Sequence, residues 1–80
     1  MGKKRKPSQL SKAEIAYEQI MQWIFNRELL PGERLVERQV AERLQISKTP
    51  VREAFLRLRK DGLVDGNVNS GVFVTKITAK

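Results

Sequence analysis

The sequence predicts a mainly α domain with a small β-hairpin, in which three helices form the core. Apolar residues repeat at the 3.6-residue helical period in three segments, and capping residues precede two of those segments. Two short β-branched and apolar runs follow the last helical segment, as in a hairpin. Eighty residues allow one small domain with a single core.

The first helix begins at a capping box, because Ser11 and Glu14 are spaced so that each side chain satisfies a free backbone N–H. Its apolar stripe consists of Ala13, Ala16, Tyr17, Ile20, Trp23 and Ile24. Arg27 would fall inside that stripe, so we expect the helix to end near residues 26–27. Met21 and Phe25 lie off the stripe. They either tuck in locally near the helix end or form a docking spot for a domain outside this chain.

Residues 29–32 contain Pro31 and Gly32 and predict a turn. Residues 33–36 leave room only for a stub of strand. A second helix is expected over about 37–44, with its inward face formed by Val40, Ala41 and Leu44. A tight link at residues 45–46 then leads to Ser47, which is a good N-cap for a third helix.

The third helix is expected over about 48–61, with Pro50 in its first turn and Gly62 at its end. Its buried face is Val51, Ala54, Phe55 and Leu58. Residues 63–65 and 72–75 then read as strands, and the loop 66–71 between them has glycine at both ends. This predicts a hairpin with a flexible tip.

Two short helices joined by a tight link suggest a helix-turn-helix, whose second helix enters a DNA major groove with its N-terminal end first. Lys48, Thr49 and Arg52 supply hydrogen-bond donors near that end, and Arg38 is placed to reach the same groove or its rim. The helix N-terminus and the Ser47 hydroxyl suit a phosphate. The hairpin would lie alongside as a wing. On spacing alone, Arg52 is equally compatible with a solvated surface residue.

Charge favours a polyanionic partner, because 16 Lys and Arg outnumber 9 Asp and Glu, giving a net charge of +7. Four of these positive charges lie at residues 3–6, so residues 1–10 are expected to form a flexible basic arm. The arm is interpreted either as a solvated tail or as a tether to the DNA backbone. Nucleic acid is the first expected partner and an anionic lipid surface the second.

Composition excludes several classes of function. The chain has no Cys and no His, so thiolate zinc sites and Cys or His catalysis are ruled out. It also shows no paired acids and no Gly-rich phosphate loop, so we expect no enzyme, cofactor or metal. No apolar run is long enough to span a membrane or to form a signal-peptide core, which argues for a soluble, reducing compartment. The expected localisation is cytoplasmic and nucleoid-associated.

Five segments together resemble the N-terminal domain of GntR-type winged helix-turn-helix regulators, in register from about Tyr17 to Val74. They are residues 31–35, 37–44, 47–54, 61–64 and 71–74. Agreement at several unrelated positions makes the resemblance specific. The run Ser-Lys-Thr-Pro-Val-Arg-Glu-Ala at 47–54 is most similar to the branch related to the fatty-acid-responsive regulator, the FadR-like branch.

The resemblance implies a bacterial transcription factor, with repressor as the expected type, that binds palindromic operators in double-stranded DNA as a dimer. It implies base or phosphate contacts from Arg38, Lys48, Thr49 and Arg52. It also implies a wing near residues 69–71 that enters the minor groove. The candidate DNA-binding set is therefore Arg38, Ser47, Lys48, Thr49, Arg52, Asn69, Ser70 and Gly71.

This sequence departs from the family pattern at three places. Lys48 stands where Arg is commoner, and a point charge fixes guanine less rigidly than a guanidinium fork. Residues 67–70 lack the Arg or His that family wings often carry, and Leu56 occupies an outward position that is usually polar.

The family's chains continue into a larger C-terminal domain that binds a small metabolite and dimerises. We therefore expect the DNA-binding domain at 11–76, with 77–80 as the start of a linker to an absent effector domain. The full-length protein would be a homodimer, and this chain alone a monomer off DNA.

Two other functions are compatible with the pattern. The fold could serve as a winged-helix protein-interaction module, although Lys48 and Arg52 stand where such a module would more often show apolar anchors. A membrane-surface peptide led by the arm would need a free apolar face, whereas the helix stripes are expected to be consumed by the core.

Overall fold

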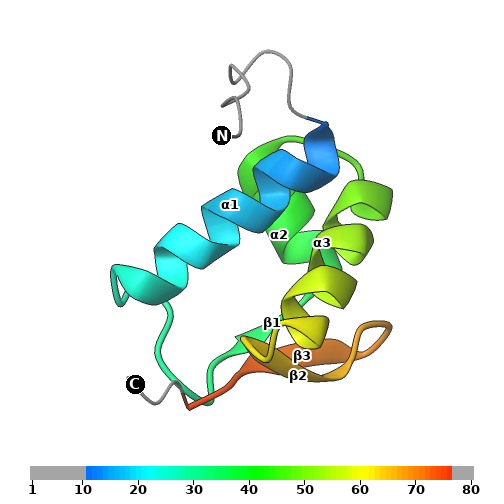
Figure 1. Ribbon diagram of the computed structural model, residues 1–80. Helices are drawn as coiled ribbons and strands as arrows, with labels where there is room; N and C mark the ends of the chain where they lie inside the picture. The colour runs from blue at the N-terminus through cyan, green and yellow to red at the C-terminus, as the bar shows by residue number, and fades with distance from the viewer. Residues whose placement is uncertain (1–10, 77–80) are drawn as a thin grey trace, which may run out of the picture.

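The computed structural model describes residues 11–76, so the predicted arm (1–10) and linker start (77–80) lie outside the described residues. The elements follow in the order α1 (Lys12–Phe25), β1 (Arg34–Leu35), α2 (Glu37–Leu44), α3 (Lys48–Lys60), β2 (Val64–Asn67) and β3 (Gly71–Val74). In Figure 1 the three helices lie above a small sheet, whose hairpin extends to one side below α3. This is the predicted three-helix core with a wing.

The capping box at the start of α1 is confirmed. The Ser11 hydroxyl accepts a hydrogen bond from the Glu14 backbone N–H at 3.0 Å, and the Glu14 carboxylate accepts one from the Ser11 N–H at 2.9 Å. The helix ends at Phe25, close to the predicted end, and Asn26 is its C-cap. Met21 packs against the core while Phe25 is 56% exposed, so only Met21 tucks in as the first alternative expected.

One hydrophobic core joins all the elements. The helix α1 packs mainly against α3, and α3 also contacts α2 and β2. The largest fully buried side chains are Phe55, Ile20, Leu58, Val51, Val64 and Val72. They come from both helices and strands, so the sheet contributes to the same core as the helices.

The strand stub at 34–35 is an edge strand of a three-stranded antiparallel sheet in the order β1-β3-β2. Leu35 pairs with Val72 and is buried, which explains why two residues suffice to attach the strand. The predicted hairpin is present, but its strands extend further toward the turn than expected. Asn67 pairs with Gly71, so the turn is only residues 68–70.

The burial of Val68, in the hairpin turn, was not predicted from the sequence: its side chain is only 9% exposed and belongs to the core. The Ser70 N–H donates to the Asn67 carbonyl at 3.0 Å and closes the turn. A β-branched apolar residue in a three-residue turn gains free energy by packing inward, which ties the turn to the domain.

Candidate nucleic-acid interface

The link between α2 and α3 gives the two helices the arrangement predicted from the sequence. Gln45 adopts a left-handed conformation (φ 60°, ψ 46°) and ends α2. The Ile46 N–H donates to the Ala41 carbonyl at 3.0 Å, which turns the chain back toward α3. Ser47 occupies the N-cap position of α3 in extended conformation. The link therefore leaves the N-terminal end of α3 at the surface.

Ser47 is the N-cap of α3 as predicted, but its hydroxyl makes no hydrogen bond to the helix. The residue is exposed, as are Lys48 and Thr49 next to it. Among residues 11–76, no acidic side chain lies in the first turn of α3. The helix start therefore presents a hydroxyl, an ammonium group and backbone N–H groups to solvent, a combination suited to an anionic ligand.

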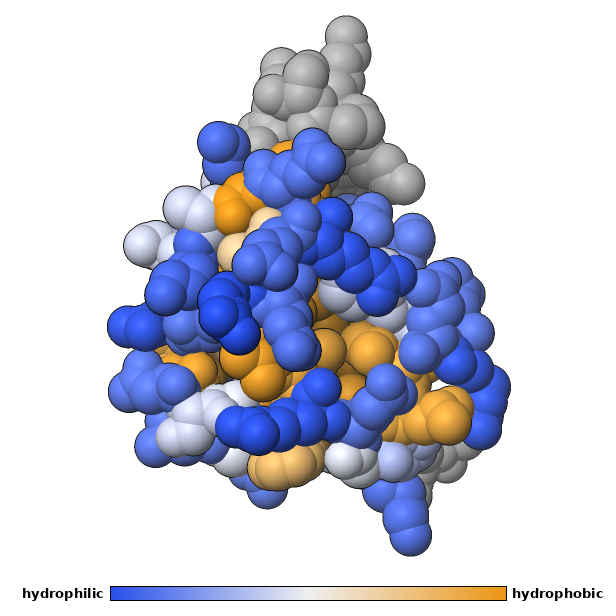
Figure 2. All heavy atoms as spheres, turned by 180° about the vertical axis from the view of Figure 1, so that it is seen from behind, coloured by the Kyte–Doolittle hydropathy of each residue, from blue (hydrophilic) through white to orange (hydrophobic). Residues whose placement is uncertain are grey.

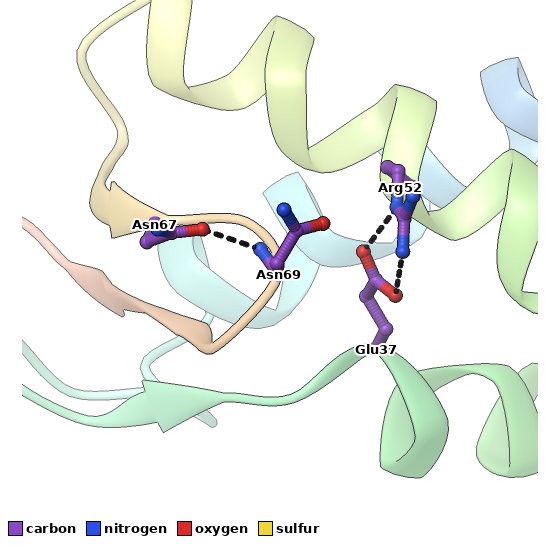
Figure 3. A network of polar contacts seen from close by, with 4 residues as sticks. All are labelled: Glu37, Arg52, Asn67 and Asn69. Carbon is purple, nitrogen blue, oxygen red and sulfur yellow. Dashed lines mark hydrogen bonds and ion pairs between the residues drawn. The ribbon is translucent and has the colours of Figure 1, made fainter.

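Arg52, one turn further along α3, is bound by a carboxylate that the sequence pattern did not single out. Its Nε lies 2.8 Å from Oε2 of Glu37, and its Nη2 lies 3.2 Å from Oε1, so the contact is bidentate (Figure 3). The hydrogen bond to Glu37, and then its negative charge, raise the pKa of Arg52. The guanidinium is thus charged and held in one orientation.

Glu37 is only 8% exposed, whereas the side chain of Arg52 is 52% exposed. The buried carboxylate thus binds the guanidinium at the edge formed by Nε and Nη2 and leaves the other edge open to solvent. The burial of Glu37, though not its pairing with Arg52, had a signal in the sequence. Glu37 lies three and four residues before the inward-facing Val40 and Ala41, on the same helix face. The Glu37–Arg52 pair thus joins the start of α2 to α3. Arg38, the next residue after Glu37, is exposed.

The wing turn carries polar, uncharged side chains. The Asn67 side-chain oxygen accepts a hydrogen bond from the Asn69 backbone N–H at 2.8 Å. In Figure 3 the side chain of Asn69 points from the turn toward the side where Glu37 and Arg52 lie. Asn69 and Ser70 are exposed, but Gly71 is buried in β3. Gly71 thus lies beneath the surface that the other two present.

Two arginines outside the hairpin donate hydrogen bonds to backbone carbonyls of the wing. The Arg34 Nη2 on β1 donates to the Ser70 carbonyl, and the Arg59 Nη1 on α3 donates to the Gly66 carbonyl at 2.8 Å. Neither contact was predicted from the sequence. Figure 2 shows polar side chains spread widely over the rear face, with apolar surface visible between them.

Two further observations concern membranes and metals. Among residues 11–76, none of the helices is both long and apolar enough to cross a membrane. The same residues bring together no group of three or more acidic, His or Cys side chains that would hold a metal ion.

The sequence is similar to those of known bacterial regulatory proteins. A family model described as "Bacterial regulatory proteins, gntR family" matches residues 12–74. An uncharacterised HTH-type transcriptional regulator of Bacillus subtilis, YdhC, is 42% identical over 64 residues, covering 80% of this chain and 29% of that protein. The HTH-type transcriptional repressor RspR of Escherichia coli is 40% identical over 50 residues, covering 62% of this chain and 22% of that protein.

Solved structures are also similar. McbR/YncC of E. coli matches with a TM-score of 0.77 and 29% identity over 86% of this chain and 32% of that one. The N-terminal domain of AraR, solved in complex with mutant ORR3, matches with a TM-score of 0.73 and 27% identity over 82% of this chain and 96% of that one. The chain spans less than a third of the length of the curated relatives named above.

Proposed function

Because the chain belongs to the gntR family of bacterial regulatory proteins, we propose that it binds a palindromic DNA operator sequence-specifically, with α3 in the major groove. The observation that carries this proposal is the orientation of Arg52. A half-exposed guanidinium, held by a buried carboxylate beside the open N-terminal end of α3, presents a fixed fork of donors. Such a fork matches the O6 and N7 acceptors of guanine.

The neighbouring residues receive distinct roles. Lys48 contacts a base edge near Arg52, and Arg38 contacts the rim of the same groove. The free hydroxyl of Ser47 and that of Thr49 donate to phosphate, together with the backbone N–H groups of the helix start. Asn69 and Ser70 lie against the minor groove, and Gly71 supports them from within β3.

The full-length protein would be a homodimeric, metabolite-responsive transcription regulator of the bacterial cytoplasm and nucleoid. Several relatives are named transcriptional regulators, and one is named a repressor. YdhC and RspR are each more than three times as long as the segment they match, which supports an effector-binding domain elsewhere in the polypeptide. Regulation of transcription, and not catalysis, is the activity that this membership supports.

The experiment starts by selecting preferred sequences from a library of randomised duplexes with this chain. Affinity is then measured for the selected duplex and for a mixed-sequence duplex, with Arg52→Ala, Lys48→Ala and the control Arg27→Ala. Arg27 lies in the turn after α1, and its replacement removes the same charge. Arg52→Ala is expected to lower affinity for the selected duplex by about 5- to 150-fold and to flatten the preference at one base pair.

Equal losses on both duplexes would make Arg52 a phosphate contact and refute its role as a base reader. A chain that binds no duplex would overturn the proposal and favour the protein-interaction alternative.

A further inference from the structure

The wing turn has no positive charge of its own, although the proposed function places it against a polyanion. Residues 67–71 are Asn, Val, Asn, Ser and Gly. Two neutral amides and a hydroxyl make polar contacts, but they release no counterions from DNA. The structure brings a cation to this position from another element: Arg34 of β1 donates a hydrogen bond from Nη2 to the Ser70 carbonyl.

The fold specifically accommodates this arginine. Pairing of Arg34 with Phe73 and of Leu35 with Val72 aligns β1 beside β3. A Cβ built on Gly71 would lie 2.6 Å from Nε of Arg34 and 3.2 Å from its Nη2. Because Gly71 has no side chain, it leaves the passage through which the guanidinium reaches the turn.

The charge of Arg34 is not neutralised within the domain. The ion pairs among residues 11–76 join Arg43 to Glu28 and Arg52 to Glu37, and Arg34 takes part in neither. Arg34 is exposed, and the Ser70 carbonyl is an uncharged acceptor. A guanidinium has five N–H donors, so further donors are available for a ligand.

We propose that Arg34 is the phosphate-binding residue of the wing, presented at the turn by the Ser70 carbonyl and by the space above Gly71. The inference rests on the proposed function, because it requires the wing to lie against DNA. A guanidinium binds a phosphate through two parallel hydrogen bonds, and one already held in place loses less entropy on binding. A phosphate contact carries no sequence information, so Arg34 adds affinity for any duplex.

The test measures affinity for a mixed-sequence duplex as a function of salt, with Arg34→Gln, Arg34→Lys and the control Arg27→Gln. Arg34→Gln keeps a hydrogen-bond donor for Ser70 and removes the charge. Arg27 is also exposed, and Figure 1 places the turn after α1 far from the wing. The slope of log K against log salt is expected to become shallower by about 0.9 in Arg34→Gln. Its loss of affinity is then about 3.5-fold larger at 50 mM than at 200 mM salt.

Arg34→Lys and Arg27→Gln are expected to keep the wild-type slope. A residue that only braces the wing would lower affinity without changing the slope, so an unchanged slope in Arg34→Gln overturns the proposal. An equal change in Arg27→Gln also overturns it, because the effect would then reflect net charge. These results differ from failure of the proposed function, in which the wild-type chain itself would bind no duplex.

Discussion

Replacing Glu37 with Gln tests whether the carboxylate prepares Arg52 for reading DNA. The substitution preserves the shape of a nearly buried side chain but removes its charge and turns one acceptor into a donor. The two bonds to Nε and Nη2, at 2.8 and 3.2 Å, need two acceptor oxygens. The amide of Gln can satisfy only one, so Arg52 regains conformational freedom.

The size of the effect follows from the exposure of Arg52. Its side chain is 52% exposed, and Glu37 is its only hydrogen-bond partner among residues 11–76. Immobilising a long side chain costs a binding reaction about 2- to 12-fold in affinity. Loss of the negative charge works the other way, because it favours binding to any duplex. The ratio of specific to mixed-sequence affinity should therefore fall about 2- to 12-fold, without loss of mixed-sequence binding.

The assay is a double-mutant cycle with fluorescence anisotropy on the selected and mixed-sequence duplexes. Glu37→Gln should lower the specificity ratio in the wild-type background and leave it unchanged when Arg52→Ala is already present. Glu53→Gln is the control, since Glu53 is exposed, follows Arg52 directly and forms no ion pair among the described residues. A specificity ratio that Glu37→Gln changes no more than Glu53→Gln would refute the reasoning.

Four further predictions concern stability, charge and assembly. Val68→Ala should destabilise the fold by about 1.5 kcal/mol and lower Tm by roughly 6–12 °C in thermal unfolding; an unchanged Tm would mean that the turn does not pack. A hydrogen bond to Asp61, together with burial, raises the pKa of Tyr17, so its stabilisation is complete below pH ~10 and is lost as pH rises through the folded pKa. Tyr17→Phe should remove that alkaline loss, as pH-dependent unfolding would show. Deleting residues 1–6 should make the salt slope shallower by about 0.9 for each phosphate that the arm neutralises, and an unchanged slope would mean that the arm does not reach DNA. Sedimentation should show a monomer without DNA, because the core is expected to leave too little apolar surface for a standard dimer interface, which buries roughly 800 Å² per partner. A stable dimer would contradict this.

Helix positions were predictable because they depend on local rules. The capping box at Ser11 and the apolar stripes of α1 and α3 report short-range geometry, and the structure confirms them. The hairpin was also predicted, but the predicted turn was too long. Glycines 66 and 71 were expected in the loop, whereas both lie in paired strands with positive φ.

Contacts between elements distant in the sequence were not predictable in the same way. Glu37 and Arg52 are fifteen residues apart, and the charge pattern alone gives no reason to pair them rather than Glu37 with Arg38 or Arg43. Arg34 and Ser70 are 36 residues apart and meet only because β1 joins the edge of the sheet. Sequence spacing suggested candidate DNA contacts, but it showed neither how Arg52 is held nor that Arg34 reaches the wing turn.

Arg52 and Arg34 are held by partners of different charge, and this difference should separate their proposed effects on DNA binding. The Glu37–Arg52 pair has no net charge, so in the proposed complex it should contribute orientation and little to counterion release. Arg34 is held by a neutral carbonyl and keeps its full charge, so in the proposed complex it should contribute to salt-dependent affinity and not to base preference. Arg34→Gln should therefore lower the salt dependence of affinity without changing the specificity ratio, whereas Glu37→Gln should lower the specificity ratio without weakening binding to a mixed-sequence duplex. If Arg34→Gln also lowered the specificity ratio, the wing and the Glu37–Arg52 pair would belong to one coupled network.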